Sequence, residues 1–168
     1  MKSKKNNFLS KNIKPCVIGL GYVGLPVFLK LSKKFSSVGF DVNKKRIQYL
    51  KKGIDYNKEY KKKDFKLKKK SFFTHKEKDI KHCNFYIVTV PTPIFRNKKP
   101  NLNLIKRAFN ILSKYINPGD IVFLESTVYP GTTENICIPI LSNSKKLKFR
   151  VDFNVGYSSE RINPGDRK

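Results

Sequence analysis

Residues 14–24 read KPCVIGLGYVG, an apolar run that passes directly into the pattern G-x-G-x-x-G. The run predicts a buried strand over Pro15–Leu20, and the apolar residues after the pattern predict a helix over Val23–Phe35. Glycines alone serve many ordinary turns. Between a strand and a helix, however, this spacing is typical of a turn that binds the pyrophosphate of a dinucleotide.

Each glycine of this turn has a separate physical task. Gly19 permits the tight turn, Gly21 lets the backbone approach a pyrophosphate, and Gly24 lets the helix pack closely on the strand. The N-terminus of the helix offers free amide groups and the positive end of the helix dipole. The alternative is a purely structural turn that is followed by a capping acid.

An acidic residue stands where a dinucleotide site needs one. Asp41 closes the next predicted strand, Ser37–Val42, and lies 22 residues after Gly19. Its carboxylate can accept hydrogen bonds from an adenosine ribose and would repel a 2′-phosphate, which favours NAD over NADP. That preference is softened by three basic neighbours, Lys44, Lys45 and Arg46.

The rest of the chain alternates apolar runs with amphipathic stretches. Apolar runs predict further strands at Ser71–Thr74, Asn84–Val90, Ile121–Glu125 and Asp152–Tyr157. Helices are predicted at Lys44–Lys52, Leu102–Tyr115 and Thr133–Leu141, and a lysine-dense helix or loop at Tyr56–Lys70. Strands that alternate with helices favour a parallel sheet with right-handed crossovers. The expected fold is α/β: Rossmann-like, doubly wound, with a mainly parallel six-stranded sheet.

The chain is strongly basic, with a formal net charge of +25. Such a charge would suit nucleic acid, an anionic membrane surface or phosphate-rich small molecules. Only six of the 37 basic residues are Arg, and the lysines are spread along the whole chain, which favours a solvated surface over a dedicated polyanion site. We therefore expect no specific nucleic-acid partner and no membrane partner.

The N-terminal region predicts a basic tail over residues 1–13, followed by one domain over residues 14–168. The apolar run Cys16–Leu29 mimics a signal peptide. It is too short to span a membrane, contains glycines and a proline, and is followed by no small-residue cleavage site. We therefore expect a cytoplasmic protein.

The three cysteines, Cys16, Cys83 and Cys137, are far apart and lie in apolar surroundings. Neither a CxxC pair nor a Cys/His spacing suggests a metal site. We interpret them as buried, reduced thiols and expect no bound metal.

Polar residues follow three of the later strands at the point where each strand ends. These blocks are VTVPTPI at 88–94, ESTVYPGTTE at 125–134 and GYSSERINPGD at 156–166. Each block alone could be a capped turn. Because parallel strands end at the sheet edge that the glycine turn also occupies, the three blocks together predict one cleft.

Together with VIGLGYVGLP at 17–26, these blocks resemble the NAD-binding domain of the UDP-glucose/GDP-mannose dehydrogenase family over residues 14–168. The last two blocks are most similar to the members that oxidise UDP-N-acetylhexosamines for capsule or O-antigen synthesis. The resemblance implies NAD as cofactor and a UDP-sugar as substrate. The sugar's primary alcohol would become a carboxylate in two oxidations, with a cysteine thioester between them. A homodimer is implied for the full-length enzymes.

The resemblance also assigns cofactor contacts to individual residues. The pyrophosphate would be held by the turn residues Gly19, Gly21, Tyr22, Val23 and Gly24. The adenosine ribose would be held by Asp41 and Arg46. Thr92 and Pro93 would line the cofactor.

Catalytic roles are implied for the last two blocks. Thr127 would lie near the nicotinamide and the reacting water. Glu160 would be the general acid/base of thioester hydrolysis, since a carboxylate can orient water, and Arg161 would lie beside it at the substrate.

Two departures from the family pattern bear on activity. Ser159 stands where the family usually has proline before the glutamate. The family's GxGGxCxPKD block, with its nucleophilic cysteine, is absent, as are the Lys and Asn that accompany hydride transfer. We therefore expect the NAD-binding portion of such an enzyme, without its catalytic and sugar-binding C-terminal domains and inactive alone.

Two alternatives remain open. One is a free-standing NAD-binding or regulatory module, in which the lysine-rich stretch 58–70 docks a polyanion. The other is a different Rossmann dehydrogenase of the β-hydroxyacid type, against which ESTVYPGTTE argues.

Overall fold

Six parallel strands form the centre of the molecule in the computed structural model, which describes residues 13–67 and 70–159. They are β1 (Pro15–Ile18), β2 (Val38–Phe40), β3 (Phe72–Thr74), β4 (Phe85–Val88), β5 (Ile121–Glu125) and β6 (Asn154–Ser158). Their order across the sheet is β3-β2-β1-β4-β5-β6, and every neighbouring pair is parallel. This is the strand order of a Rossmann fold, so the predicted fold class is confirmed.

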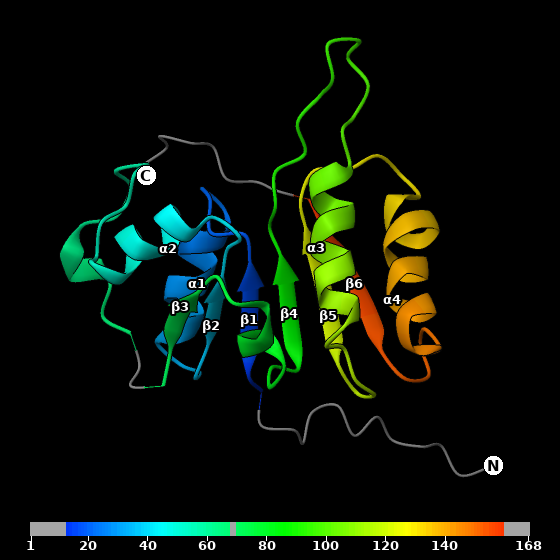
Figure 1. Cartoon of the computed structure of the whole chain (residues 1–168), viewed down its shortest axis with the longest axis horizontal. Helices are drawn as coiled ribbons and strands as arrows, with labels where there is room; N and C mark the ends of the chain where they lie inside the picture. Colours follow the sequence, from blue (N-terminus) through cyan, green and yellow to red (C-terminus); the bar gives the residue numbers. More distant parts are fainter. Residues whose placement is uncertain (1–12, 68–69, 160–168) are drawn as a thin grey trace.

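Helices cover both faces of this sheet (Figure 1). The longer ones are α1 (Gly24–Ser32), α2 (Lys44–Lys51), α3 (Asn103–Ser113) and α4 (Ile138–Lys145). Shorter helical turns are η2 (Lys62–Asp64), η3 (Glu77–Ile80) and the π-helical η4 (Thr133–Cys137), which leads into α4. The predicted tail over residues 1–13 lies outside the described residues except for Ile13.

The core consists of two apolar clusters, one on each face of the sheet. Successive side chains of a strand point to opposite faces. Cys16 and Ile18 of β1 therefore pack with α3 and α4, whereas Val17 packs with α1 and α2. A central strand buried on both sides explains the unbroken apolar run that precedes the glycine turn.

The strands β1, β2 and β4 end earlier than their apolar runs predicted, whereas β3 and β5 end where predicted and β6 ends one residue later. β1 stops at Ile18 because Gly19 adopts a φ of +92°, which turns the chain out of the strand. β4 stops at Val88, so that Thr89 and Val90 lie beyond it, at the end of the sheet where the glycine turn lies. The residues just after each strand are therefore available to a ligand.

A hairpin that the sequence did not indicate projects from the molecule after β4 (Figure 1). The Phe95 amide donates to the Lys99 carbonyl at 2.9 Å, and the Asn101 amide donates to the Pro93 carbonyl at 2.8 Å. Its residues are exposed and lack a periodic apolar pattern, so the sequence carried no signal for it.

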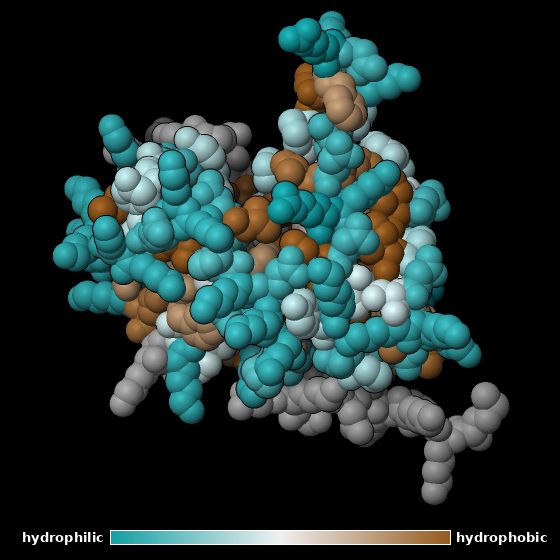
Figure 2. All heavy atoms as spheres, in the orientation of Figure 1, coloured by the Kyte–Doolittle hydropathy of each residue, from teal (hydrophilic) through white to brown (hydrophobic). Residues whose placement is uncertain are grey.

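Hydrophilic side chains cover much of the visible face and come from the helices, the loops and the projecting hairpin alike (Figure 2). Among the described helices, none has the length and apolar character needed to cross a membrane. The part of the chain that the structure describes also holds no cluster of three or more His, Cys, Asp or Glu side chains suited to a metal ion.

Candidate functional site

The glycine turn follows β1 and is hydrogen-bonded to the ends of β2 and β4. The Gly19 amide donates to the Phe40 carbonyl of β2 at 2.9 Å. From the β4 side, the Thr89 hydroxyl donates to the Gly19 carbonyl at 2.7 Å. A Cβ on Gly24 would overlap the Gly19 carbonyl oxygen and the Thr89 hydroxyl. Only glycine therefore lets α1 start this close to β1.

Gly21 has the opposite surroundings. A Cβ placed on it would meet no atom within 4 Å. The amides of Tyr22 and Val23, at the start of α1, donate no hydrogen bond within the described residues. An open backbone beside free amides at a helix N-terminus is the arrangement that a pyrophosphate requires.

Asp41 lies beside this turn, with its carboxylate held by backbone amides. Oδ2 accepts from the Leu20 amide at 2.9 Å, and Oδ1 accepts from the Asn43 amide at 2.8 Å. Each carboxylate oxygen can accept a further hydrogen bond. The half-buried Asp41 side chain therefore presents a fixed negative charge with free acceptor capacity.

Arg46 lines the same site, but its guanidinium binds other groups of the protein. Nε donates to the Leu20 carbonyl at 2.9 Å, and Nη1 pairs with Asp55 Oδ1 at 2.8 Å. Nη2 is buried without a hydrogen-bond partner among the described residues. The role of Arg46 at the ribose stays a prediction, whereas its support of the glycine turn is visible.

Asp55, which the sequence analysis did not single out, organises the loop after α2. Besides pairing with Arg46, its carboxylate accepts the backbone amides of Asn57, Glu59 and Tyr60 at 3.3, 3.1 and 3.3 Å. The side chains of the ion pair are 8% and 1% exposed. Arg46 and Asp55 thus tie the glycine turn to residues 55–60. No sequence motif indicates such an ion pair.

Breaking this buried pair should destabilise the domain strongly. Asp55→Asn keeps the size of the side chain but leaves the Arg46 charge buried and unpaired, so we expect a loss of about 3 kcal/mol in the free energy of unfolding. Urea unfolding followed by circular dichroism measures it. The control is Glu77→Gln, which breaks the exposed 2.9 Å pair with Lys114 and should change the free energy of unfolding far less, because solvent screens an exposed pair. Equal losses would contradict the structural role of Asp55.

The blocks after β4 and β5 are joined by side-chain hydrogen bonds. The Thr92 hydroxyl donates to the Thr127 carbonyl at 2.7 Å, and the Ser126 hydroxyl donates to the Val90 carbonyl at 2.8 Å. Thr92 is half-buried, whereas Thr127 and the neighbouring Pro93 are exposed. Two of the predicted polar blocks therefore meet at one edge of the sheet.

The third block begins at the same edge. In the register of β5 and β6, Glu125 lies opposite Ser158. Glu160 and Arg161, for which catalytic and substrate roles were predicted, lie outside the described residues.

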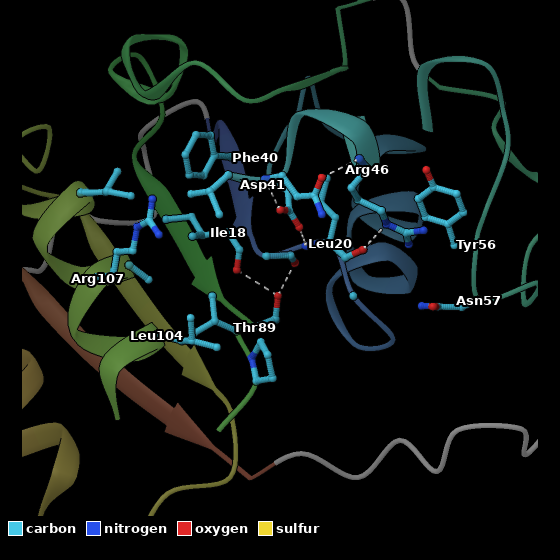
Figure 3. Close-up of a pocket in the computed structure, with 18 residues that line it drawn as sticks. Ile18, Leu20, Phe40, Asp41, Arg46, Tyr56, Asn57, Thr89, Leu104 and Arg107 are labelled. Atoms are coloured by element: carbon cyan, nitrogen blue, oxygen red, sulfur yellow. Dashed lines mark hydrogen bonds between the residues drawn. The ribbon is translucent and has the colours of Figure 1, made fainter. Parts of the chain in front are cut away.

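A cavity of about 360 Å³ opens between the ends of β1, β2 and β4 (Figure 3). It lies where the strand order reverses, which is the place where open α/β sheets bind ligands. Figure 3 shows Leu104 and Arg107 of α3 on one side, Tyr56 on the other, and Asp41 with Leu20 between them. Apolar residues dominate the lining from α3 and from the strand ends, namely Leu104, Ala108 and Ile111 of α3 and Ile18, Phe40 and Val90 at or after the ends of β1, β2 and β4.

This site fits the adenosine and pyrophosphate portions of a dinucleotide. Gly21 leaves room for the pyrophosphate, Asp41 offers acceptors for ribose hydroxyls, and the apolar slot suits a purine ring. The α3 wall and Tyr56 were missed by the sequence analysis. Their place depends on how α3 and the loop after α2 pack over the sheet, for which no local pattern exists.

Comparisons with known proteins identify the family of the chain. Residues 13–167 match the sequence model described as "UDP-glucose/GDP-mannose dehydrogenase family, NAD binding domain". A UDP-N-acetyl-D-glucosamine 6-dehydrogenase from Salmonella typhi is 51% identical over 156 residues, which are 93% of this chain and 37% of that protein. Its counterpart from Pseudomonas aeruginosa is 47% identical over 94% of this chain and 37% of its own length.

Solved structures give the same result. A UDP-D-ManNAc dehydrogenase from Pyrococcus horikoshii superposes with a TM-score of 0.82 at 32% identity, over 91% of this chain and 37% of that one. The 168 residues thus span little more than a third of the length of these relatives. The predicted cofactor, NAD, is confirmed by the matching domain. The chain belongs to the UDP-glucose/GDP-mannose dehydrogenase family and corresponds to its NAD-binding domain.

Proposed function

We propose that this chain is the NAD-binding part of an enzyme that oxidises the primary alcohol of a UDP-N-acetylhexosamine to the uronate, for polysaccharide biosynthesis. The observation that carries the proposal is the cavity that joins the glycine turn, the Asp41 carboxylate and the ends of β1 and β4. The choice of sugar rests on the two relatives named as UDP-N-acetyl-D-glucosamine 6-dehydrogenases, at 51% and 47% identity.

In this proposal the described residues bind and orient the cofactor. The amides of Tyr22 and Val23 donate to the pyrophosphate, Asp41 accepts from the adenosine ribose, and the linked Thr92 and Thr127 hold the nicotinamide end. Bound NAD supplies the hydride acceptor of the reaction. Glu160 and Arg161 belong to the substrate side, as general acid/base and substrate ligand.

We further propose a cytoplasmic enzyme that is a homodimer at full length. The three described cysteines are free and buried, which suits a reducing compartment. The dimer rests on the family resemblance. No specific nucleic-acid partner is proposed, because the lysines are spread over the whole chain.

Titration of the chain with both cofactors tests this function. NAD should bind at least about tenfold more tightly than NADP, because the 2′-phosphate would face the fixed Asp41 charge. Isothermal titration calorimetry measures both affinities. Asp41→Asn should reduce the difference in affinity between NAD and NADP, since it removes the charge of the side chain and keeps its shape. Equal or tighter binding of NADP by the wild-type chain would overturn the assignment of Asp41.

A further inference from the structure

We propose that Arg107 is a further cofactor-binding residue that holds the adenine ring of the dinucleotide with its guanidinium plane. The inference rests on the proposed NAD-binding function and adds a contact that the glycine turn and Asp41 do not provide. Arg107 belongs to α3, on the opposite side of the cavity from Tyr56 (Figure 3).

The wall that carries Arg107 is one stripe of α3. Leu104, Arg107, Ala108 and Ile111 occupy positions i, i+3, i+4 and i+7, so they share one helix face, and all four line the cavity. Three of them are apolar. Opposite this stripe, Ile18 and Phe40 come from the ends of β1 and β2. The slot between the two walls is therefore apolar on both sides, as a flat aromatic base requires.

Arg107 is the charged side chain of the α3 wall, and it has no partner among the described residues. Asp41 already accepts two backbone amides, and Arg46 is engaged by the Leu20 carbonyl and Asp55. Arg107 is exposed and makes no hydrogen bond or ion pair with any described residue. A planar guanidinium stacks favourably on an aromatic face, which is rich in electrons.

The position of Arg107 favours a contact with the adenine base of the ligand over a contact with its phosphates. The pyrophosphate belongs at Gly21 and the start of α1, and a ribose 2′-substituent belongs beside Asp41. In Figure 3 Arg107 lies apart from Asp41 and Leu20, on the side of the cavity where Leu104 lies. A purine that extends from the ribose into the apolar slot would pass in front of the guanidinium.

Affinities of Arg107 variants test the inference. Arg107→Ala should weaken binding of NAD and of ADP-ribose by the same factor, about 2- to 30-fold. Arg107→Lys should recover only part of this loss, because an ammonium lacks the planar face. Lys106→Ala is the matched control: it removes one positive charge from the next position of α3, outside the cavity lining, and should leave both affinities unchanged. Thermal unfolding should show that all variants are folded, since both side chains are exposed.

The outcomes separate the alternatives. If Lys106→Ala lost as much affinity for NAD as Arg107→Ala, the effect would be one of general charge and the inference would be overturned. A larger loss for NADP than for NAD in Arg107→Ala would show a contact with the 2′-phosphate and would overturn it too. Unchanged NAD affinity in Arg107→Ala would overturn this inference alone, whereas a wild-type chain that binds no NAD would overturn the proposed function and this inference with it.

Discussion

The variant Gly21→Val should lose NAD binding, with a dissociation constant raised at least about 100-fold, while the domain stays folded. A Cβ at Gly21 meets no protein atom within 4 Å, so a valine side chain there would extend into the space that the pyrophosphate needs. The backbone of Gly21 is also not in the left-handed region that favours glycine, so valine adds little strain. Calorimetric titration with NAD measures the loss, and circular dichroism on heating measures the stability.

Gly24→Ala is the matched control for this experiment. Its Cβ would overlap the Gly19 carbonyl and the Thr89 hydroxyl, so this variant should lose stability as well as binding. The two glycines, three positions apart, would then separate ligand contact from packing. If Gly21→Val still binds NAD with near wild-type affinity, the turn is purely structural and the proposed function fails.

The second large effect is an absence of turnover: the 168-residue chain should form no NADH from UDP-N-acetylglucosamine, UDP-N-acetylgalactosamine or UDP-glucose. The second oxidation proposed for this family needs a thiolate to capture the aldehyde. Cys16, Cys83 and Cys137 are all free and buried. Burial raises the pKa of the Cys16 thiol well above its usual range, and burial raises the pKa of the Cys137 thiol to about 12.

Thiol chemistry provides an independent readout of the same prediction. A raised pKa keeps the protonated form dominant, so at pH 8 the Cys137 thiol stays almost entirely protonated. All three thiols are buried, so a thiol reagent such as Ellman's reagent should react with the unfolded chain but not with the folded one at pH 8. The reactivity of Cys137 should rise only toward strongly alkaline pH.

NADH absorbance is the primary measurement. Sustained NADH production that depends on a UDP-sugar would show that the catalytic groups are present within these 168 residues. It would contradict the view that this chain only binds and orients the cofactor. The same chain should still bind NAD in the calorimetric titration, which separates a missing catalytic group from a misfolded protein.

Much of the fold could be predicted because its signals are local. A strand buried on both faces must be apolar throughout, and Cys16, Val17 and Ile18 are. The tasks of Gly19 and Gly24 could be predicted because the G-x-G-x-x-G spacing between a strand and a helix requires a tight turn. In the structure Gly19 has a φ of +92°, and no room is left for a side chain at Gly24. Asp41 could be found because it directly follows the strand next to that turn.

The sequence by itself thus determined the Rossmann-like fold class, the glycine turn and the acidic residue beside it. These features depend on neighbours within about one βαβ unit. Tertiary structure alone decided the rest. Arg46 pairs with Asp55 and the Leu20 carbonyl, and Arg107 lines the cavity, because of how α2, its following loop and α3 pack on the sheet. A side chain's partner across such packing depends on the distance and angle between elements, which spacing along the chain does not encode.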